Sequence, residues 1–100
     1  MSPKTNLEWL QEWYSRHTDG DWEHQNGITI ETIDNPGWSV LIDLDGTELS
    51  DKDFQRREVE RNENDWFHIF IDHGEFEIAC GPLNLEEALG IFREWAEGKV

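Results

Sequence analysis

The chain has 100 residues, 36% of them hydrophobic, and its 23 acidic and 8 basic residues give a formal net charge of −15 at pH 7. A chain of this length is expected to form one domain over residues 1–100, because it is too short to divide its core. So negative a surface repels nucleic acid and anionic membranes, and it attracts a basic partner. Simple solubility, or an origin in a salt-adapted cell, is the alternative explanation of the charge.

Nothing in the sequence suggests secretion or insertion into a membrane. Cys80 is the one cysteine, so no intrachain disulfide can form. The first residues, MSPKTNLEW, contain no apolar segment of signal-peptide length, and no apolar run approaches the length of a membrane span. These features predict a cytoplasmic protein.

The first predicted element is an amphipathic helix over residues 5–17. Thr5 and Glu8 have the spacing of a capping box, which satisfies two free amides at a helix start. Apolar side chains then recur every three or four residues along the segment. The helix is expected to end at Asp19-Gly20, because glycine readily adopts the left-handed conformation found after helix ends.

Five short strands are expected in the middle of the chain, because apolar and polar residues alternate there between turn sequences. Asn35-Pro36-Gly37 is predicted to form a type II turn, in which glycine supplies the required positive φ. The segment 54–61 is highly charged; a strand is predicted there, with a helix as the alternative. The predicted strands cover residues 27–33, 38–44, 54–61, 66–72 and 75–80.

The last predicted element is a helix that begins at Leu85 and ends near Gly98, with Asn84 as its N-cap and Glu87 three residues later. The order of helix, five strands and helix, with short connections, predicts an α+β fold. Its core would be an antiparallel meander sheet of about five strands, flanked by an N-terminal and a C-terminal helix.

If both helices cover the same face of this sheet, the other face stays open. Strand alternation places acidic and aromatic side chains together on that open face. Its expected members are Glu31, Leu41, Asp43, Trp66, His68, Phe70, Glu75 and Glu77.

The segment DGDWEHQNG, residues 19–27, is the first candidate for a chemical site, since acids and a histidine surround a tryptophan. Loops that begin at Asp19 or at Asp43 lack the glycine and glutamate that a calcium loop needs at positions six and twelve. The four histidines have no zinc-binding spacing, and a second cysteine is absent from the sequence. The sequence therefore predicts no metal, no cofactor and no catalytic residue, and a protein that is not an enzyme.

The alternative is a small acidic hydrolase or thiol enzyme that uses Asp19, Asp21, His24 or Cys80. A thiolate just before a helix could be stabilised by the helix dipole. Acidic residues follow Cys80 closely, however, and they favour a buried structural cysteine. A metabolic or structural subunit with a permanent partner is a third possibility.

Several of the six tryptophans have polar neighbours, which favours an interaction surface. Half-exposed tryptophans surrounded by acids are typical of protein interfaces, where rigid aromatic anchors are enclosed by a polar rim. Acids would speed the encounter with a basic partner. The predicted partner-binding residues are Asp21, Trp22, Glu23, Glu31, Asp43, Trp66, His68, Glu75 and Glu77.

The segments LEWLQEWY, DGDWEHQNGITIETIDNPGWSV, NENDWFHIFI and GPLNLEEALGIFREWA resemble the immunity protein 53 family of bacterial polymorphic toxin systems. The resemblance runs from about Leu7 to Ala96, and DGDWEH followed by a glycine-led strand and DNPGW is its most specific part. It implies an immunity protein that binds a cognate secreted toxin inside the cell and neutralises it by occlusion. If the toxin is a nuclease, its substrate-binding surface is basic, and an acidic inhibitor could cover that surface in place of phosphate.

Overall fold

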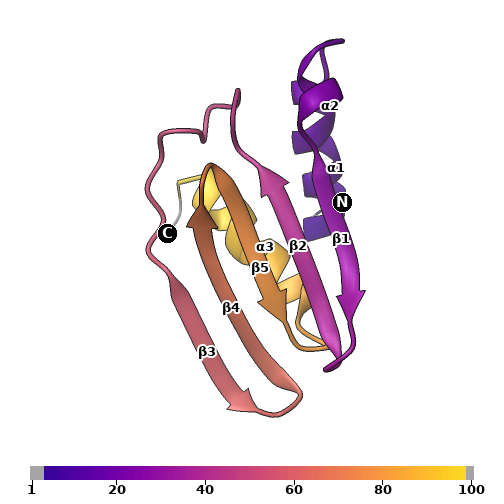
Figure 1. Ribbon diagram of the computed structural model, residues 1–100, viewed down its shortest axis with the longest axis vertical. Coiled ribbons are helices and arrows are strands. Elements are labelled where there is room, and N and C mark those ends of the chain that lie inside the picture. The colour runs from indigo at the N-terminus through magenta and orange to yellow at the C-terminus, as the bar shows by residue number, and fades with distance from the viewer. Residues whose placement is uncertain (1–3, 99–100) are drawn as a thin grey trace.

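The fold is one antiparallel sheet with helices packed on one face, as the computed structural model shows for residues 4–98 (Figure 1). The predicted α+β class, with five strands between an N-terminal and a C-terminal helix, is confirmed. The elements are α1 (Asn6–His17), α2 (Trp22–Gln25), β1 (Ile28–Ile33), β2 (Gly37–Asp43), β3 (Arg57–Asn62), β4 (Asp65–Asp72), β5 (Glu75–Cys80) and α3 (Leu85–Ala96).

The strand order is β1-β2-β5-β4-β3, and every neighbouring pair is antiparallel. This order differs from a simple meander at one point, because β2 pairs with β5 and the segment after β2 crosses to the far edge. The charged strand β3, which carries REVERN, thereby lies at an edge. Its charges stay near water there, and the apolar strands β2, β4 and β5 fill the buried centre.

Helix α1 begins as its sequence predicts. The Thr5 hydroxyl accepts a hydrogen bond from the Glu8 amide at 3.1 Å, and the Thr5 amide donates to the Glu8 carboxylate at 2.9 Å, which completes the capping box. The helix ends at His17, and Gly20 follows with a φ of 92°. The predicted stop at Asp19-Gly20 is therefore confirmed.

Helix α3 also begins where it was predicted to begin, but Asn84 does not cap it through its side chain. The Asn84 carboxamide oxygen accepts a hydrogen bond from the Trp66 amide at 3.2 Å. Its amide nitrogen donates to Asp65 at 2.9 Å and to Glu87 at 3.0 Å. Asn84 is 5% exposed, so these bonds satisfy a buried polar group and fasten the start of α3 to β4.

The predicted type II turn at residues 35–37 is wrong. Gly37 has no positive φ; it is the first residue of β2 and pairs with Ile33. The Asn35–Pro36 peptide bond is cis. His73 and Gly74, with φ values of 50° and 79°, form the reversal between β4 and β5. Residues 57–61 of the charged segment 54–61 belong to β3, so a strand forms there and not the alternative helix.

The core lies between the sheet and the helices α1 and α3, and aromatic rings dominate it. The Trp13 ring on α1 meets the Phe92 ring on α3 edge to face, with centroids 5.3 Å apart. Phe76 on β5 lies 4.8 Å from Phe92 and 5.3 Å from Trp95. Such contacts add to the large apolar area that each ring buries, and they hold both long helices on the same side of the sheet.

Candidate functional site

The face of the sheet turned away from the helices is the first candidate surface. Figure 1 shows the long helices behind the sheet, with the opposite face toward the viewer. The strand register aligns Leu41, Glu77 and Phe70 in one row across β2, β5 and β4. The open face holds every residue predicted for it: Glu31, Leu41, Asp43, Trp66, His68, Phe70, Glu75 and Glu77.

Strand β4 lines this face with three half-buried rings at alternate positions, Trp66, His68 and Phe70. The Trp66 and His68 rings lie 5.5 Å apart at 68°, and the Arg56 guanidinium lies 4.4 Å from the centre of the Phe70 ring. Within residues 4–98, Nε2 of His68 is shielded from solvent and has no hydrogen-bond partner. The rings therefore form an aromatic platform that contains one unsatisfied polar atom.

Three carboxylates, Asp43, Glu75 and Glu77, lie together beside this platform on β2 and β5. Burial raises the pKa of Glu75, and the negative charges of Glu77 and Asp43 raise it further. Like charges held this close destabilise one another. A cationic group placed against the open face would relieve that repulsion.

The Glu75→Gln variant is expected to unfold at higher denaturant concentration than the parent at neutral pH. Because the folded-state pKa of Glu75 is raised, its ionisation opposes folding above that pKa. The penalty disappears below the ordinary glutamate pKa, where Glu75 is protonated in both states. The difference between the two proteins should thus vanish in acid, which urea titrations at neutral and acidic pH would measure. Glu63→Gln, in the exposed β3–β4 turn, is the control, and an equal gain from it would contradict the prediction.

The DGDWEHQNG segment is a hydrogen-bonded turn that contains α2. The Asp19 carboxylate accepts hydrogen bonds from the amides of Trp22 and Asp21 at 3.0 and 2.9 Å, and these bonds lower its pKa. The Glu23 carboxylate accepts from the amides of Asp19 and Gly20 at 2.9 and 2.8 Å. These carboxylates are used to close the connection between α1 and β1.

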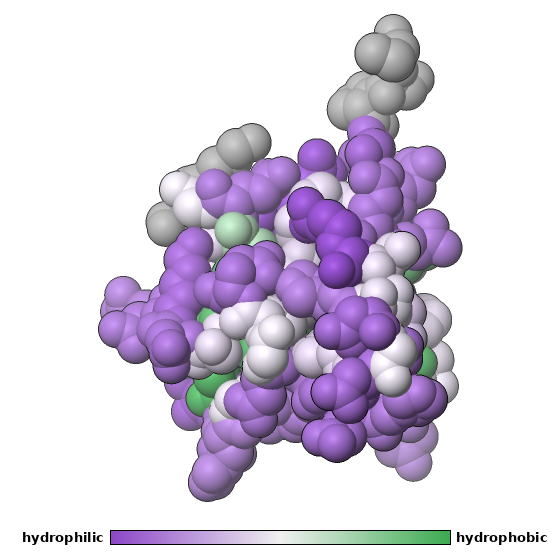
Figure 2. Space-filling model, turned by 90° about the horizontal axis from the view of Figure 1, so that it is seen from above, coloured by the Kyte–Doolittle hydropathy of each residue, from purple (hydrophilic) through white to green (hydrophobic). Residues whose placement is uncertain are grey.

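Trp22 packs inward and is 8% exposed, so its ring supports the turn. Its indole nitrogen donates to the Asp45 carbonyl at 2.7 Å, and the Gly27 amide donates to the Asp43 carboxylate at 2.9 Å. These bonds place the turn beside the acidic end of β2, and hydrophilic residues cover most of the surface seen from that end (Figure 2). Asp21 is exposed there and Glu23 is half-buried.

The residues of the alternative enzyme hypothesis do not lie together. Asp19, Asp21 and His24 are exposed in the turn before β1, whereas Cys80 pairs with Trp38 at the opposite end of the sheet. Cys80 is fully buried, and burial raises the pKa of its thiol to about 11. Within residues 4–98, no group of three or more His, Cys, Asp or Glu side chains is arranged to hold a metal ion.

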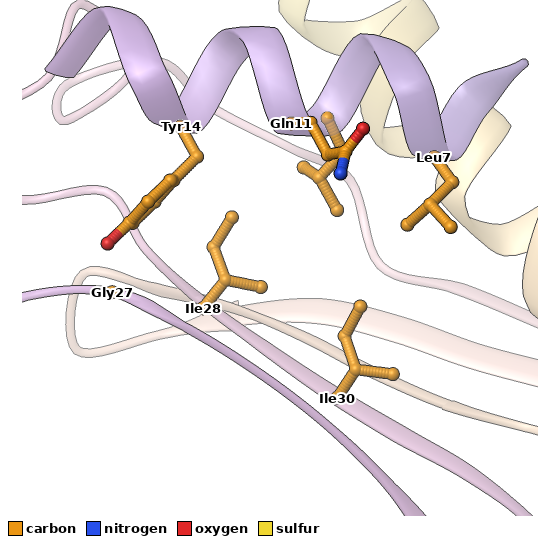
Figure 3. Close-up of a pocket in the computed structure, with 7 residues that line it drawn as sticks. Leu7, Gln11, Tyr14, Gly27, Ile28 and Ile30 are labelled. Atoms are coloured by element: carbon orange, nitrogen blue, oxygen red, sulfur yellow. The ribbon is translucent and has the colours of Figure 1, made fainter. Parts of the chain in front are cut away.

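One surface was missed in the sequence, a groove between α1 and β1 (Figure 3). The helical spacing of Leu7 and Tyr14 indicated one amphipathic stripe facing the core. The structure buries Leu10 and Trp13 from that stripe and leaves Leu7 49% and Tyr14 37% exposed. The α1–β1 groove has a volume of about 310 Å³ and is lined by Leu7, Leu10, Gln11, Tyr14, Gly27, Ile28 and Ile30.

Comparison with known proteins identifies a family that the chain matches. The model of a family described as immunity protein 53 matches residues 7–97, from the first turn of α1 to just past the end of α3. Neither the curated proteins nor the solved structures gave a match. Within residues 4–98, no helix is both long enough and apolar enough to span a bilayer.

Proposed function

The chain belongs to the immunity protein 53 family, and we propose that it binds a cognate secreted toxin and neutralises it by covering the toxin's active surface. It does so in the bacterial cytoplasm, as part of a polymorphic toxin system used in competition between bacteria. It acts by occlusion and catalyses no reaction. The observation that carries this proposal is the open sheet face, which combines an aromatic platform with concentrated negative charge.

The aromatic platform on β4 supplies the contact area. Trp66 and Phe70 are held by the sheet, so few rotamers are lost when a partner covers them. Large rigid rings at the centre of an interface carry much of its binding energy.

The acids around the platform supply the attraction. Asp43, Glu75 and Glu77 stand beside the rings, and Glu31 lies in the same row as His68. They speed the encounter with a basic surface. The exposed Asp21 and half-buried Glu23 extend the rim past the end of β2, and Trp22 holds that rim in place.

The toxin is proposed to be a nuclease. Its substrate-binding surface would be positive, because it must hold a phosphate backbone. A chain with a net charge of −15 can occupy such a surface in place of nucleic acid. A complex whose affinity does not change with ionic strength would contradict this part of the proposal.

The test is co-expression with the toxin domain encoded beside the chain's own gene. The chain should restore growth, and Trp66→Ala should weaken the complex by roughly 30-fold, as expected for a central aromatic anchor. The triple variant Asp43→Asn, Glu75→Gln, Glu77→Gln should slow association about tenfold at a moderate ionic strength of about 0.1 M, measured by surface plasmon resonance. A chain that binds the toxin without restoring growth would overturn neutralisation.

The control removes the same charge from other parts of the surface. Asp51→Asn, Glu63→Gln, Glu94→Gln neutralises three exposed acids outside the open face. It should leave the association rate within about twofold of the parent, because long-range attraction is screened over roughly 10 Å at moderate salt. If both triple variants slow association equally, total charge matters and the open face is not the binding surface.

A further inference from the structure

The α1–β1 groove is apolar and open to a partner. Figure 3 shows Leu7 and Tyr14 extending from α1 toward Ile28 and Ile30, which extend from β1. Within residues 4–98, three large hydrophobic side chains are exposed, and Leu7 and Tyr14 are two of them; Leu83 is the third. Exposed apolar walls around a recess are a common mark of a binding site on a soluble protein.

The wall formed by β1 is also a free sheet edge, since β1 pairs with β2 alone among the described strands. The Asp43 amide donates to the Gly27 carbonyl at 3.1 Å. Gly27 and every second residue after it in β1 therefore point their backbone amides and carbonyls toward β2. Ile28, Ile30 and Thr32 must then direct their amides and carbonyls outward. The side chains of these three residues lie on the helix side of the sheet, and those of Ile28 and Ile30 line the groove.

The two edges of the sheet differ in protection. The edge strand β3 carries REVERN, in which four of six residues are charged, whereas β1 carries ITIETI, with Glu31 as its one charge. Charged side chains on an edge discourage pairing with another chain, and β-branched residues favour it. The composition of β1 therefore favours pairing of its free edge with another strand.

We propose that an extended segment of the toxin adds a sixth strand beside β1 and inserts apolar side chains into the α1–β1 groove. This inference rests on the proposed function, because it names how part of the toxin is held. Backbone bonds to the outward groups of Ile28, Ile30 and Thr32 give affinity, and the groove selects the side chains, as in other cases of strand addition.

The register of β1 defines the chemistry of that segment. A residue opposite Ile30 points its side chain into the groove, so alternate residues of the segment are apolar. The residues between them lie on the open face beside Glu31, where a lysine or arginine would form a cross-strand pair. A second copy of this chain is disfavoured as the occupant, because each copy brings a charge of −15.

Amide hydrogen exchange resolved by residue tests the strand addition directly. Outward amides exchange with solvent in the free chain, and those of Ile28, Ile30 and Thr32 should become protected when the toxin domain binds. If the toxin contacts the open face alone, these three amides should exchange as fast as in the free chain, because the open face presents side chains and not these amides. Binding of the toxin without this protection would overturn the strand addition and leave the proposed function intact.

Two variants test the backbone and the groove separately. Thr32→Pro removes one outward amide, a change that an edge strand tolerates, and Leu7→Gln with Tyr14→Gln makes the groove polar. Each should weaken toxin binding about tenfold, whereas Thr32→Ala and Leu83→Gln should change it less than about threefold. Equal effects in variants and controls would contradict the proposal.

A synthetic peptide tests the strand addition without the toxin. The probe is Lys-Val-Lys-Ile-Lys-Val, and its control has the same composition in the order Lys-Lys-Lys-Val-Ile-Val. Protection of the three amides by the alternating peptide alone would support the strand addition even if the toxin does not bind. No protection by peptide or toxin would overturn it. Protection in the free chain that is lost on dilution would identify a second copy as the occupant, which also overturns it.

Discussion

The Trp13→Ala variant is expected to lose about 3–5 kcal/mol of its free energy of unfolding, the usual cost of deleting a fully buried tryptophan. Trp13 is 0% exposed and joins parts of the fold that are distant in sequence. Its ring meets Phe92 on α3 at 5.3 Å and Trp22 on α2 at 6.3 Å. Its indole nitrogen donates to Glu48, in the segment that crosses from β2 to β3, at 3.2 Å.

Small domains have a free energy of unfolding of about 5–15 kcal/mol, so this change alone removes a large share of it. Denaturant titration followed by circular dichroism measures the loss. Trp13→Phe should cost less, because it keeps the ring contacts and gives up the bond to Glu48. Trp66→Ala is the matched control, because Trp66 is a half-buried tryptophan on the open face. Equal losses from Trp13→Ala and Trp66→Ala would show that the core is not centred on the helix side.

The Gly37→Ala variant is expected to lose about 3 kcal/mol, at the upper end of the usual cost of overpacking. A Cβ atom at Gly37 would lie 2.2 Å from the Cys80 carbonyl oxygen and 3.4 Å from a side-chain carbon of Ile33. The carbonyl belongs to the last residue of β5, where β5 pairs with β2. The alanine therefore fits only if the two central strands separate at that end.

Gly27→Ala provides the comparison for that loss. No heavy atom of the described residues, chain neighbours aside, lies within 4 Å of a Cβ placed at Gly27. Its effect should stay within about 0.5 kcal/mol, with a slight gain possible from a more restricted unfolded chain. Denaturant titration of both variants measures their free energies of unfolding. Similar midpoints for the two would show that the approach of Gly37 to β5 is not tight.

The helices, the strands and the two faces of the sheet could be predicted because each depends on neighbouring residues. The capping box at Thr5 and Glu8 acts within one helical turn. The alternation in β4 assigns Trp66, His68 and Phe70 to one face wherever the strand lies, since side chains of a strand alternate with period two. The open face was predictable for this reason, once both helices were assumed to share the other face.

The features that were missed depend on partners distant in the chain. Gly37 was assigned to a type II turn, although its role is close approach to Cys80 across β2 and β5. Asn84 is the N-cap residue of α3, as predicted, but its side chain binds the Trp66 amide on β4 and does not cap the helix. Local rules gave the position of this cap, and tertiary contacts decided what the Asn84 side chain binds and why Gly37 must be glycine.

By itself, the sequence determined the negative charge, the class of the fold and the set of side chains on the open face, because composition and short-range periodicity are local quantities. The tertiary structure alone decided that β2 lies beside β5, that β1 is a free edge and that Leu7 and Tyr14 line a groove beside it. The physical reason is that strand order and helix rotation minimise exposed apolar area over the whole chain, and no segment carries that information alone.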